Sequence, residues 1–218
     1  MTAGSRACVE RHAVGYDLRM RDAFSDLPSA EVRRWNIRPL ELNDLDGLMQ
    51  VQEACYGSGY MESMETYRAR LACPAQCSLV VVQQGVVLAY LAAYRSTLGS
   101  ITPLHGNFPS QGRSQDGKAT PSGGKTGERG DALQDTLYLH DMAVSPDYGA
   151  QGLASALLTA LWESARDWSP RYAALVSVQG SQSYWARKGY AVHAELTEEN
   201  TKALRSYGHD AVYMTRPY

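Results

Sequence analysis

The chain has 218 residues, 44% of them hydrophobic and 20% charged, and its formal net charge is −2. This composition supports one folded domain with a substantial core and excludes a chain that is disordered throughout. The small net charge argues against general binding to nucleic acid or acidic membranes. No apolar run approaches the roughly 20 residues that span a bilayer, and residues 1–30 lack the apolar segment of a secretory signal. We therefore expect a cytoplasmic protein.

The N-terminal residues 1–34 show no sustained hydrophobic periodicity, so we expect a loosely ordered extension there. A single folded domain is predicted over residues 35–218, beginning with a short edge strand at 35–39. A helix should follow, because Asn43 is a good N-cap residue and Asp46 lies three positions later, as in a capping box.

A second short helix is predicted over residues 62–71. Two Val-rich apolar runs come next, at 78–83 and 86–94, and only Gln84 and Gly85 separate them. Two such runs joined by a polar–Gly pair predict a β-hairpin.

The composition changes sharply between about residues 99 and 134. From residue 110 to 130, Ala119 is the only apolar side chain apart from Pro121, so burial cannot offset the entropy of ordering this stretch. We expect a disordered insertion at 99–134, with a functional loop as the alternative. Its Gly-Lys-Thr at 124–126 matches the end of a P-loop, but the first glycine and the flanking strand and helix are missing.

The second half of the domain alternates strands and helices. Helical periodicity is strongest where Leu153, Leu157 and Leu161 recur on one face. The predicted elements are strands at 137–144, 172–178, 190–195 and 211–215, and helices from Leu153 onward and over 181–188. With the hairpin, they predict an α/β fold in which helices flank a mixed sheet.

The turn between the strand at 137–144 and the next helix is built from small residues. The unpaired N–H groups and the positive dipole end of a helix attract anions, and Gly149, Ala150, Gly152 and Ala154 would let a phosphate approach the main chain. An ordinary strand–helix turn would explain the same residues. A dinucleotide fingerprint is absent, because no Gly-x-Gly-x-x-Gly occurs here.

Four cysteines occur, and Cys73 and Cys77 have a spacing that metal sites also use. No second Cys or His pair completes a zinc site, so we expect buried thiols and no metal.

Residues 139–158 resemble the acetyl-CoA signature of the GNAT superfamily of N-acetyltransferases. The family pattern is Arg/Gln-x-x-Gly-x-Gly/Ala, and residues 149–154 read Gly-Ala-Gln-Gly-Leu-Ala, so Gly149 departs from the pattern. A second family segment, Tyr-x-x-x-Gly-Phe, is similar to Trp-Ala-Arg-Lys-Gly-Tyr at 185–190. The order of the other elements also resembles the family.

The resemblance implies a GNAT-like α/β (α+β) fold with a mixed, mostly antiparallel central sheet of about 6–7 strands flanked by helices. It implies acetyl-CoA as co-substrate, with the pantetheine arm paired to the strand and the pyrophosphate held by the loop amides. The implied cofactor-binding residues are Met142, Ala143, Val144, Gly149, Ala150, Gln151, Gly152, Leu153, Ala154 and Trp185.

Catalysis of this kind needs a base, acting directly or through water, because an alkyl amine is protonated at neutral pH. In several GNAT enzymes the base lies four residues before the final Val of the strand. That position is His140 here, and an imidazole pKa of about 6.5 suits the task. Asp141 should face the other side of the sheet unless the strand bulges. Tyr184 is the candidate acid for the CoA thiolate, with water as the alternative.

The expected reaction moves an acetyl group from acetyl-CoA to the amine of a small molecule, or less readily of a peptide, by direct attack. Tyr56, Tyr60, Met61 and Glu65 lie where GNAT proteins wall the acceptor site, although an ordinary helix–helix contact would also explain them. A homodimer is compatible with the sequence. Two alternatives stay open: an acyl-CoA-binding sensor or interaction module of the same fold, and an α/β protein that binds another nucleotide.

Overall fold

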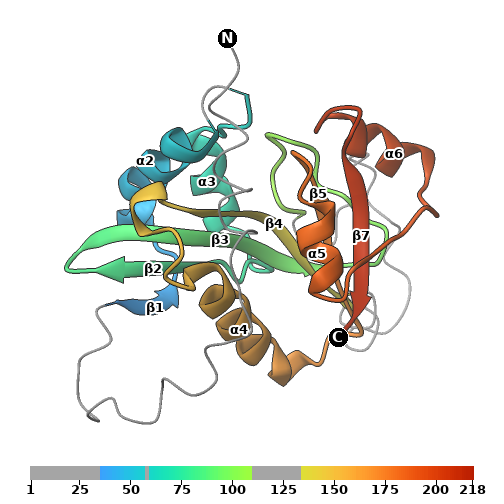
Figure 1. Cartoon of the computed structure of the whole chain (residues 1–218). Helices are drawn as coiled ribbons and strands as arrows, with labels where there is room; N and C mark the ends of the chain where they lie inside the picture. The colour runs from blue at the N-terminus through green and yellow to red at the C-terminus, as the bar shows by residue number, and fades with distance from the viewer. Residues whose placement is uncertain (1–34, 57–58, 110–133) are drawn as a thin grey trace.

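The computed structural model describes residues 35–56, 59–109 and 134–218 (Figure 1). The extension predicted at 1–34 lies outside the described residues. So does most of the predicted insertion, including its P-loop-like segment.

A seven-stranded sheet forms the centre of the domain, in the order β1-β2-β3-β4-β5-β7-β6. All neighbouring strands are antiparallel except β4 and β5, which confirms the predicted mixed, mostly antiparallel sheet. The strands are β1 (Asn36–Pro39), β2 (Leu79–Gln83), β3 (Val86–Ser96), β4 (Thr136–Val144), β5 (Tyr172–Ser177), β6 (Ala191–Val192) and β7 (Val212–Pro217).

Helices cover both faces of this sheet (Figure 1). One buried cluster joins α2, α3 and α6 to one face, and a second joins α4 and α5 to the other. The helices are α2 (Leu45–Tyr56), α3 (Met64–Leu71), α4 (Leu153–Ala165), α5 (Gln182–Arg187) and α6 (Glu198–Arg205). In the described part of the chain, no helix combines the length and the apolar character that a membrane span requires.

Local patterns explain the central elements. In β3 nine of the eleven positions are buried, because helices pack on both sides of this central strand, and the sequence there is accordingly a continuous apolar run. In α4 the side chains of Leu153, Leu157 and Leu161, which recur at the predicted 3–4 spacing, are buried.

Two predictions about local structure are wrong. The capping box forms between Glu41 and Asp44 in a 3-10 turn (Leu42–Asp44) ahead of α2, rather than between Asn43 and Asp46. Asp44 is drawn into this role because its carboxylate also accepts two hydrogen bonds from Arg38, at 2.6 and 2.7 Å. The strand predicted at 190–195 is reduced to the two residues of β6, and α6 was not predicted.

The first part of the predicted disordered insertion, residues 99–109, is ordered and packs against the core through Ile101 and Phe108, so that expectation is wrong for this stretch. Ile101 and Phe108 are 1% and 5% exposed, and the Ile101 N–H donates to Asn200 Oδ1 at 2.8 Å. These apolar side chains bury enough surface to order the segment, whereas the polar composition begins only after it.

Candidate active site

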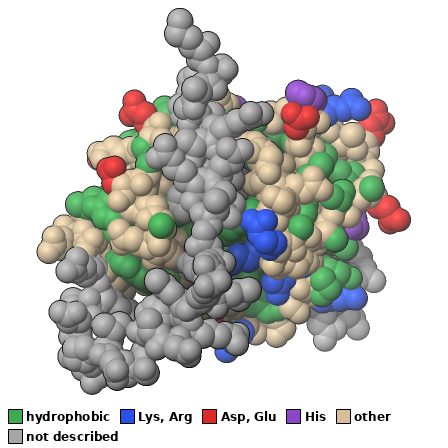
Figure 2. Space-filling view, viewed as in Figure 1, with side chains coloured by type: hydrophobic (Ala, Val, Ile, Leu, Met, Phe, Trp, Pro, Cys, Tyr) green, Lys and Arg blue, Asp and Glu red, His purple; other side chains and the backbone are tan. Residues whose placement is uncertain are grey.

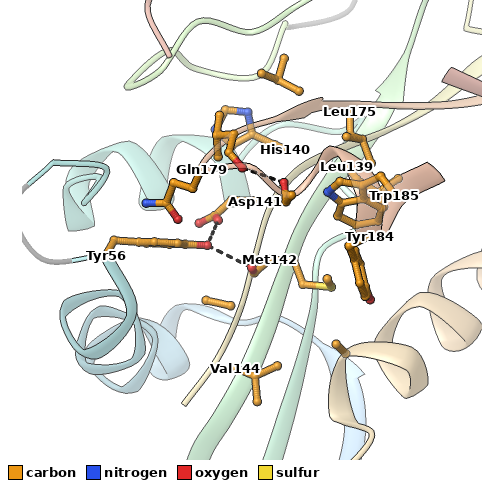
Figure 3. A pocket seen from close by; sticks show the side chains of 15 residues that line it. Tyr56, Leu139, His140, Asp141, Met142, Val144, Leu175, Gln179, Tyr184 and Trp185 are labelled. Atoms are coloured by element: carbon orange, nitrogen blue, oxygen red, sulfur yellow. Dashed lines mark hydrogen bonds between the residues drawn. The ribbon is translucent and has the colours of Figure 1, made fainter. Parts of the chain in front are cut away.

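Strands β4 and β5 diverge halfway along β4, and a cleft opens between them. Their pairing ends at Leu139 and Leu175, although β4 continues to Val144. The cleft has an empty volume of about 870 Å³, which includes the part open to solvent. Its lining residues come from β4, β5, the start of α4, α5 and the end of α2 (Figure 3).

A β-bulge in β4 decides which side chains face the helices α2 and α3. Ala92 pairs with Asp141 and Ala93 pairs with Leu139, so His140 has no partner on β3. The extra residue interrupts the alternation of side chains. His140 and Asp141 therefore lie on the same face of the sheet. In an unbulged strand the two side chains would face opposite sides.

The turn before α4 exposes a series of main-chain amides. The first hydrogen bond of the helix runs from Ala156 N–H to the Gly152 carbonyl, at 3.0 Å. Among the described residues, none accepts a hydrogen bond from the N–H groups at positions 150–155. Ala150 and Gly152 adopt left-handed φ angles of 62° and 76°, a geometry that turns successive amides toward one side and favours anions. Gly149 differs, because its N–H donates to the Pro146 carbonyl at 3.3 Å.

His140 belongs to a buried network with Glu62 and Arg70. Its Nε2 lies 3.2 and 3.3 Å from the two Glu62 oxygens, and the Arg70 guanidinium makes a two-pronged ion pair with the same carboxylate, with Nη2–Oε1 at 2.6 Å. Arg70 also donates to the Gly106 carbonyl, at 2.7 and 3.1 Å. The imidazole Nδ1 faces the Tyr207 hydroxyl at 3.4 Å. Both ring nitrogens therefore face protein groups, and the His140 side chain is 1% exposed.

Burial sets the charges in this network. Burial alone would raise the pKa of Glu62, but hydrogen bonds from Arg70 and His140 outweigh it and hold that pKa below its ordinary range. Burial, and then the charge of Arg70, lower the pKa of His140 below its ordinary 6.5. At neutral pH the imidazole is therefore neutral beside a charged carboxylate. Nε2 carries the proton that Glu62 accepts, and the basic lone pair lies on Nδ1.

Asp141 accepts hydrogen bonds from three tyrosine hydroxyls. Tyr56 donates to Oδ1 at 2.6 Å, and Tyr67 and Tyr90 both donate to Oδ2, Tyr67 at 2.8 Å. Burial, and then the Asp141 charge, raise the pKa of each of these tyrosines well above 10, so the hydroxyls stay protonated donors. The Tyr56 hydroxyl also lies 3.0 Å from the Met142 carbonyl (Figure 3).

The sequence profile described as the acetyltransferase (GNAT) family matches residues 45–190, about two thirds of the chain. The chain belongs to the GNAT acetyltransferase family. No curated protein sequence matches it.

Solved GNAT structures share the fold at low sequence identity. The ribosomal-protein-S18-alanine N-acetyltransferase from Escherichia coli is 16% identical, with a TM-score of 0.54 over 84% of this chain and 93% of that one. The PaiA N-acetyltransferase from Thermoplasma acidophilum, in complex with coenzyme A, is 11% identical, with a TM-score of 0.52 over 84% and 99%. A GNAT-like decarboxylase, GphF, in complex with isobutyryl-CoA, is 15% identical, with a TM-score of 0.53 over 84% and 98%.

Both aromatic residues of the pair on α5 of this GNAT domain line the cleft, and Trp185 is the more deeply buried of the two. Trp185 is 9% exposed and packs edge-on against Tyr184 and Tyr190, with ring centroids 5.0 and 5.5 Å apart. Tyr184 is half-buried and lines the cleft. Lys188 Nζ lies 3.4 Å from the Ser155 hydroxyl in the first turn of α4 and 5.7 Å from the Tyr184 ring centroid.

Other residues singled out in the sequence are distributed unevenly. Tyr56 lines the cleft, whereas the Tyr60 hydroxyl donates to the Tyr207 carbonyl at 3.1 Å, and neither Met61 nor Glu65 is among the cleft-lining residues. The predicted cofactor-binding residues Met142, Ala143, Val144, Ala154 and Trp185 do line the cleft. Within the described ranges, no group of three or more His, Cys, Asp or Glu side chains is arranged to hold a metal ion.

Sequence reasoning missed Glu62, Arg70, Tyr67, Tyr90 and Tyr207 as members of the site. The three-residue spacing of Tyr67 and Arg70 does mark the buried side of α3. No spacing in the sequence relates the others to His140 or Asp141, because long-range packing alone brings them together.

Proposed function

We propose that this GNAT domain transfers an acetyl group from acetyl-CoA to the amine of a small molecule by direct attack of the amine on the thioester. A peptide amine is the less favoured acceptor. The observation that carries the proposal is the cleft between β4 and β5, which runs from exposed amides at the start of α4 to the buried polar groups on the bulge.

The residues at the start of α4 suit the pyrophosphate of acetyl-CoA. Among the described residues, no atom beyond the two chain neighbours lies within 4 Å of a Cβ built on Gly152, so the space beside this amide is open to a ligand. Amides at 150–154 would hold the diphosphate, and Lys188 would supply the positive charge that the family pattern places at position 149. Figure 2 shows a group of Lys and Arg side chains over the gap between α4 and α5.

The strand edge would hold the pantetheine arm. Among the described residues, no strand pairs with residues 142–144 on the side of β4 that faces the cleft. Residues 142–144 would offer this edge to the amide groups of the arm, and Trp185 would pack against it.

The proposed base is His140. When bound, acetyl-CoA supplies a thioester carbon that accepts the amine and a thiolate that leaves. Glu62 holds the imidazole with its basic Nδ1 lone pair available and stabilises the imidazolium that forms when a proton arrives. Because the ring is enclosed, the proton would travel through a water or a hydroxyl. The Tyr207 hydroxyl lies 3.4 Å from Nδ1 and donates its own proton to the Thr102 carbonyl at 2.7 Å, so it would have to turn from Thr102 to relay a proton. Tyr184, which lines the cleft, is the proposed proton donor to the thiolate.

A catalytically weak acyl-CoA sensor of the same fold is the second candidate. Two observations favour it: the enclosed His140 ring, and Gly149 in place of the Arg or Gln of the family pattern.

Thiol release from acetyl-CoA with a panel of amines tests the proposal against the sensor. Turnover with at least one amine, lost on His140→Gln, supports the transferase. Tight CoA binding without thiol release from any amine would favour the sensor.

A further inference from the structure

The lining of the cleft contains an acidic side chain but no strongly basic one. Among its fifteen lining residues, Asp141 is the only Asp or Glu, and burial keeps the imidazole of His140 neutral. No Lys or Arg side chain is among them. Lys188 lies at the other end, beside the first turn of α4. A ligand group that reaches the bulge therefore meets a negative charge with no positive neighbour on the cleft wall.

The Asp141 carboxylate has donors but no counter-ion. Three neutral hydroxyls contact it, and no Lys, Arg or His side chain among the described residues lies within ion-pair distance. A carboxylate removed from bulk water is stabilised by such hydrogen bonds, but a cation stabilises it further. Oδ1 accepts from Tyr56 alone, so it retains a lone pair for another donor.

We propose that Asp141 binds the acceptor as an organic ammonium ion, and that the carbon bearing the amine carries no carboxylate. This inference rests on the proposed acetyl transfer and names its substrate class. The ammonium would donate to Asp141 Oδ1, and an apolar body would contact Val176 and Val178, which line the cleft on the same face of the sheet. An α-amino acid would bring a second carboxylate to Asp141, where no cation on the cleft wall neutralises it.

The order of events follows from the position of the two side chains on the bulge. Asp141 selects and holds the protonated amine. The ammonium proton then passes through a water or hydroxyl to His140, and the free amine attacks. Asp141 is thus a binding residue, and its loss should raise KM for the amine far more than it lowers kcat.

The test compares acceptors that differ in one charge: phenylethylamine, phenylalaninol and phenylalanine. Thiol release by the wild-type protein should show kcat/KM for the first two at least about 100-fold above that for phenylalanine. Asp141→Asn should raise KM for phenylethylamine by about 10- to 100-fold and leave the acetyl-CoA Kd unchanged. Asp167→Asn removes one exposed carboxylate outside the cleft and should change neither value. Equal use of phenylalanine and phenylethylamine, or an unchanged KM in Asp141→Asn, would overturn the proposal.

Failure of acetyl transfer is distinguishable from failure of the charge preference. If no acceptor releases thiol, transfer is refuted, and calorimetric titration of the CoA-loaded wild-type protein with the same three compounds still measures the preference. Tighter binding of phenylethylamine and phenylalaninol than of phenylalanine supports Asp141 as the cation site. Equal binding, or no binding of any of them, overturns it. These wild-type comparisons remain decisive if Asp141→Asn fails to fold.

Discussion

Replacing Gly152 with alanine should separate the cost of backbone strain from the cost of lost phosphate binding. Gly152 is the N-cap residue of α4, with φ at 76°, where an L-residue is strained by about 1–2 kcal/mol. In the described part of the chain, no atom beyond the two chain neighbours lies within 4 Å of the new Cβ. The fold should therefore lose only this strain, or roughly 2–8 °C in Tm at about 2–4 °C per kcal/mol.

The new Cβ would occupy the open space in front of the amides. Displacing a phosphate from one of them loses a hydrogen bond to a charged group, worth about 1.5–3 kcal/mol, so the acetyl-CoA Kd should rise roughly 10- to 150-fold. Gly85 provides the matched control. Its φ is 81°, and a Cβ built on it also has no described atom beyond the chain neighbours within 4 Å. It lies in the β2–β3 turn away from the cleft.

Calorimetry with acetyl-CoA and thermal unfolding of both variants complete this experiment. Both variants should lose similar stability, while only Gly152→Ala loses affinity. Wild-type affinity in a folded Gly152→Ala variant, or an equal loss in Gly85→Ala, would show that the pyrophosphate does not bind at this helix start.

Four further predictions concern the charged groups. His140→Gln should lower kcat by about 10²–10⁴-fold and spare the acetyl-CoA Kd, whereas unchanged turnover would remove His140 as the base. Glu62→Gln breaks a buried ion pair and should lower the unfolding free energy by about 3–5 kcal/mol in urea titrations; a loss below about 1 kcal/mol would contradict the described network. Because the folded protein holds the pKa of His140 below 6.5, the unfolded chain takes up this proton first as the pH falls, so stability should decline below about pH 6.5 and decline less in His140→Gln. Lys188→Ala should weaken acetyl-CoA binding severalfold at low salt and less at high salt, while Lys202→Ala on exposed α6 should have no effect, and equal effects of the two would remove Lys188 from the phosphate site.

Local signals in the sequence accounted for the elements that position the site. The hairpin, β4 and α4 were predictable because alternation, apolar runs and 3–4 spacing each report on one segment and the face that it buries. The small-residue turn before α4 could also be located, because the helix start that exposes its amides follows directly in the chain. The N-cap of α2 was misplaced because Arg38 selects Asp44 through a contact that no helical pattern records.

By itself, then, the amino-acid sequence determined the family, the order of the strands and of the helices α2 to α5, and the place of the glycine-containing turn, all of which depend on neighbours in the chain. Only the tertiary structure decided that His140 lacks a partner on β3, and that the resulting bulge places Asp141 on the same face of the sheet as His140. It also decided that Glu62, from the segment before α3, reaches the imidazole. It also decided that three tyrosines from α2, α3 and β3 converge on one carboxylate. The physical reason is that a bulge and a buried polar cluster are selected by the packing and hydrogen bonding of distant segments, and those interactions leave no periodic trace in the residues themselves.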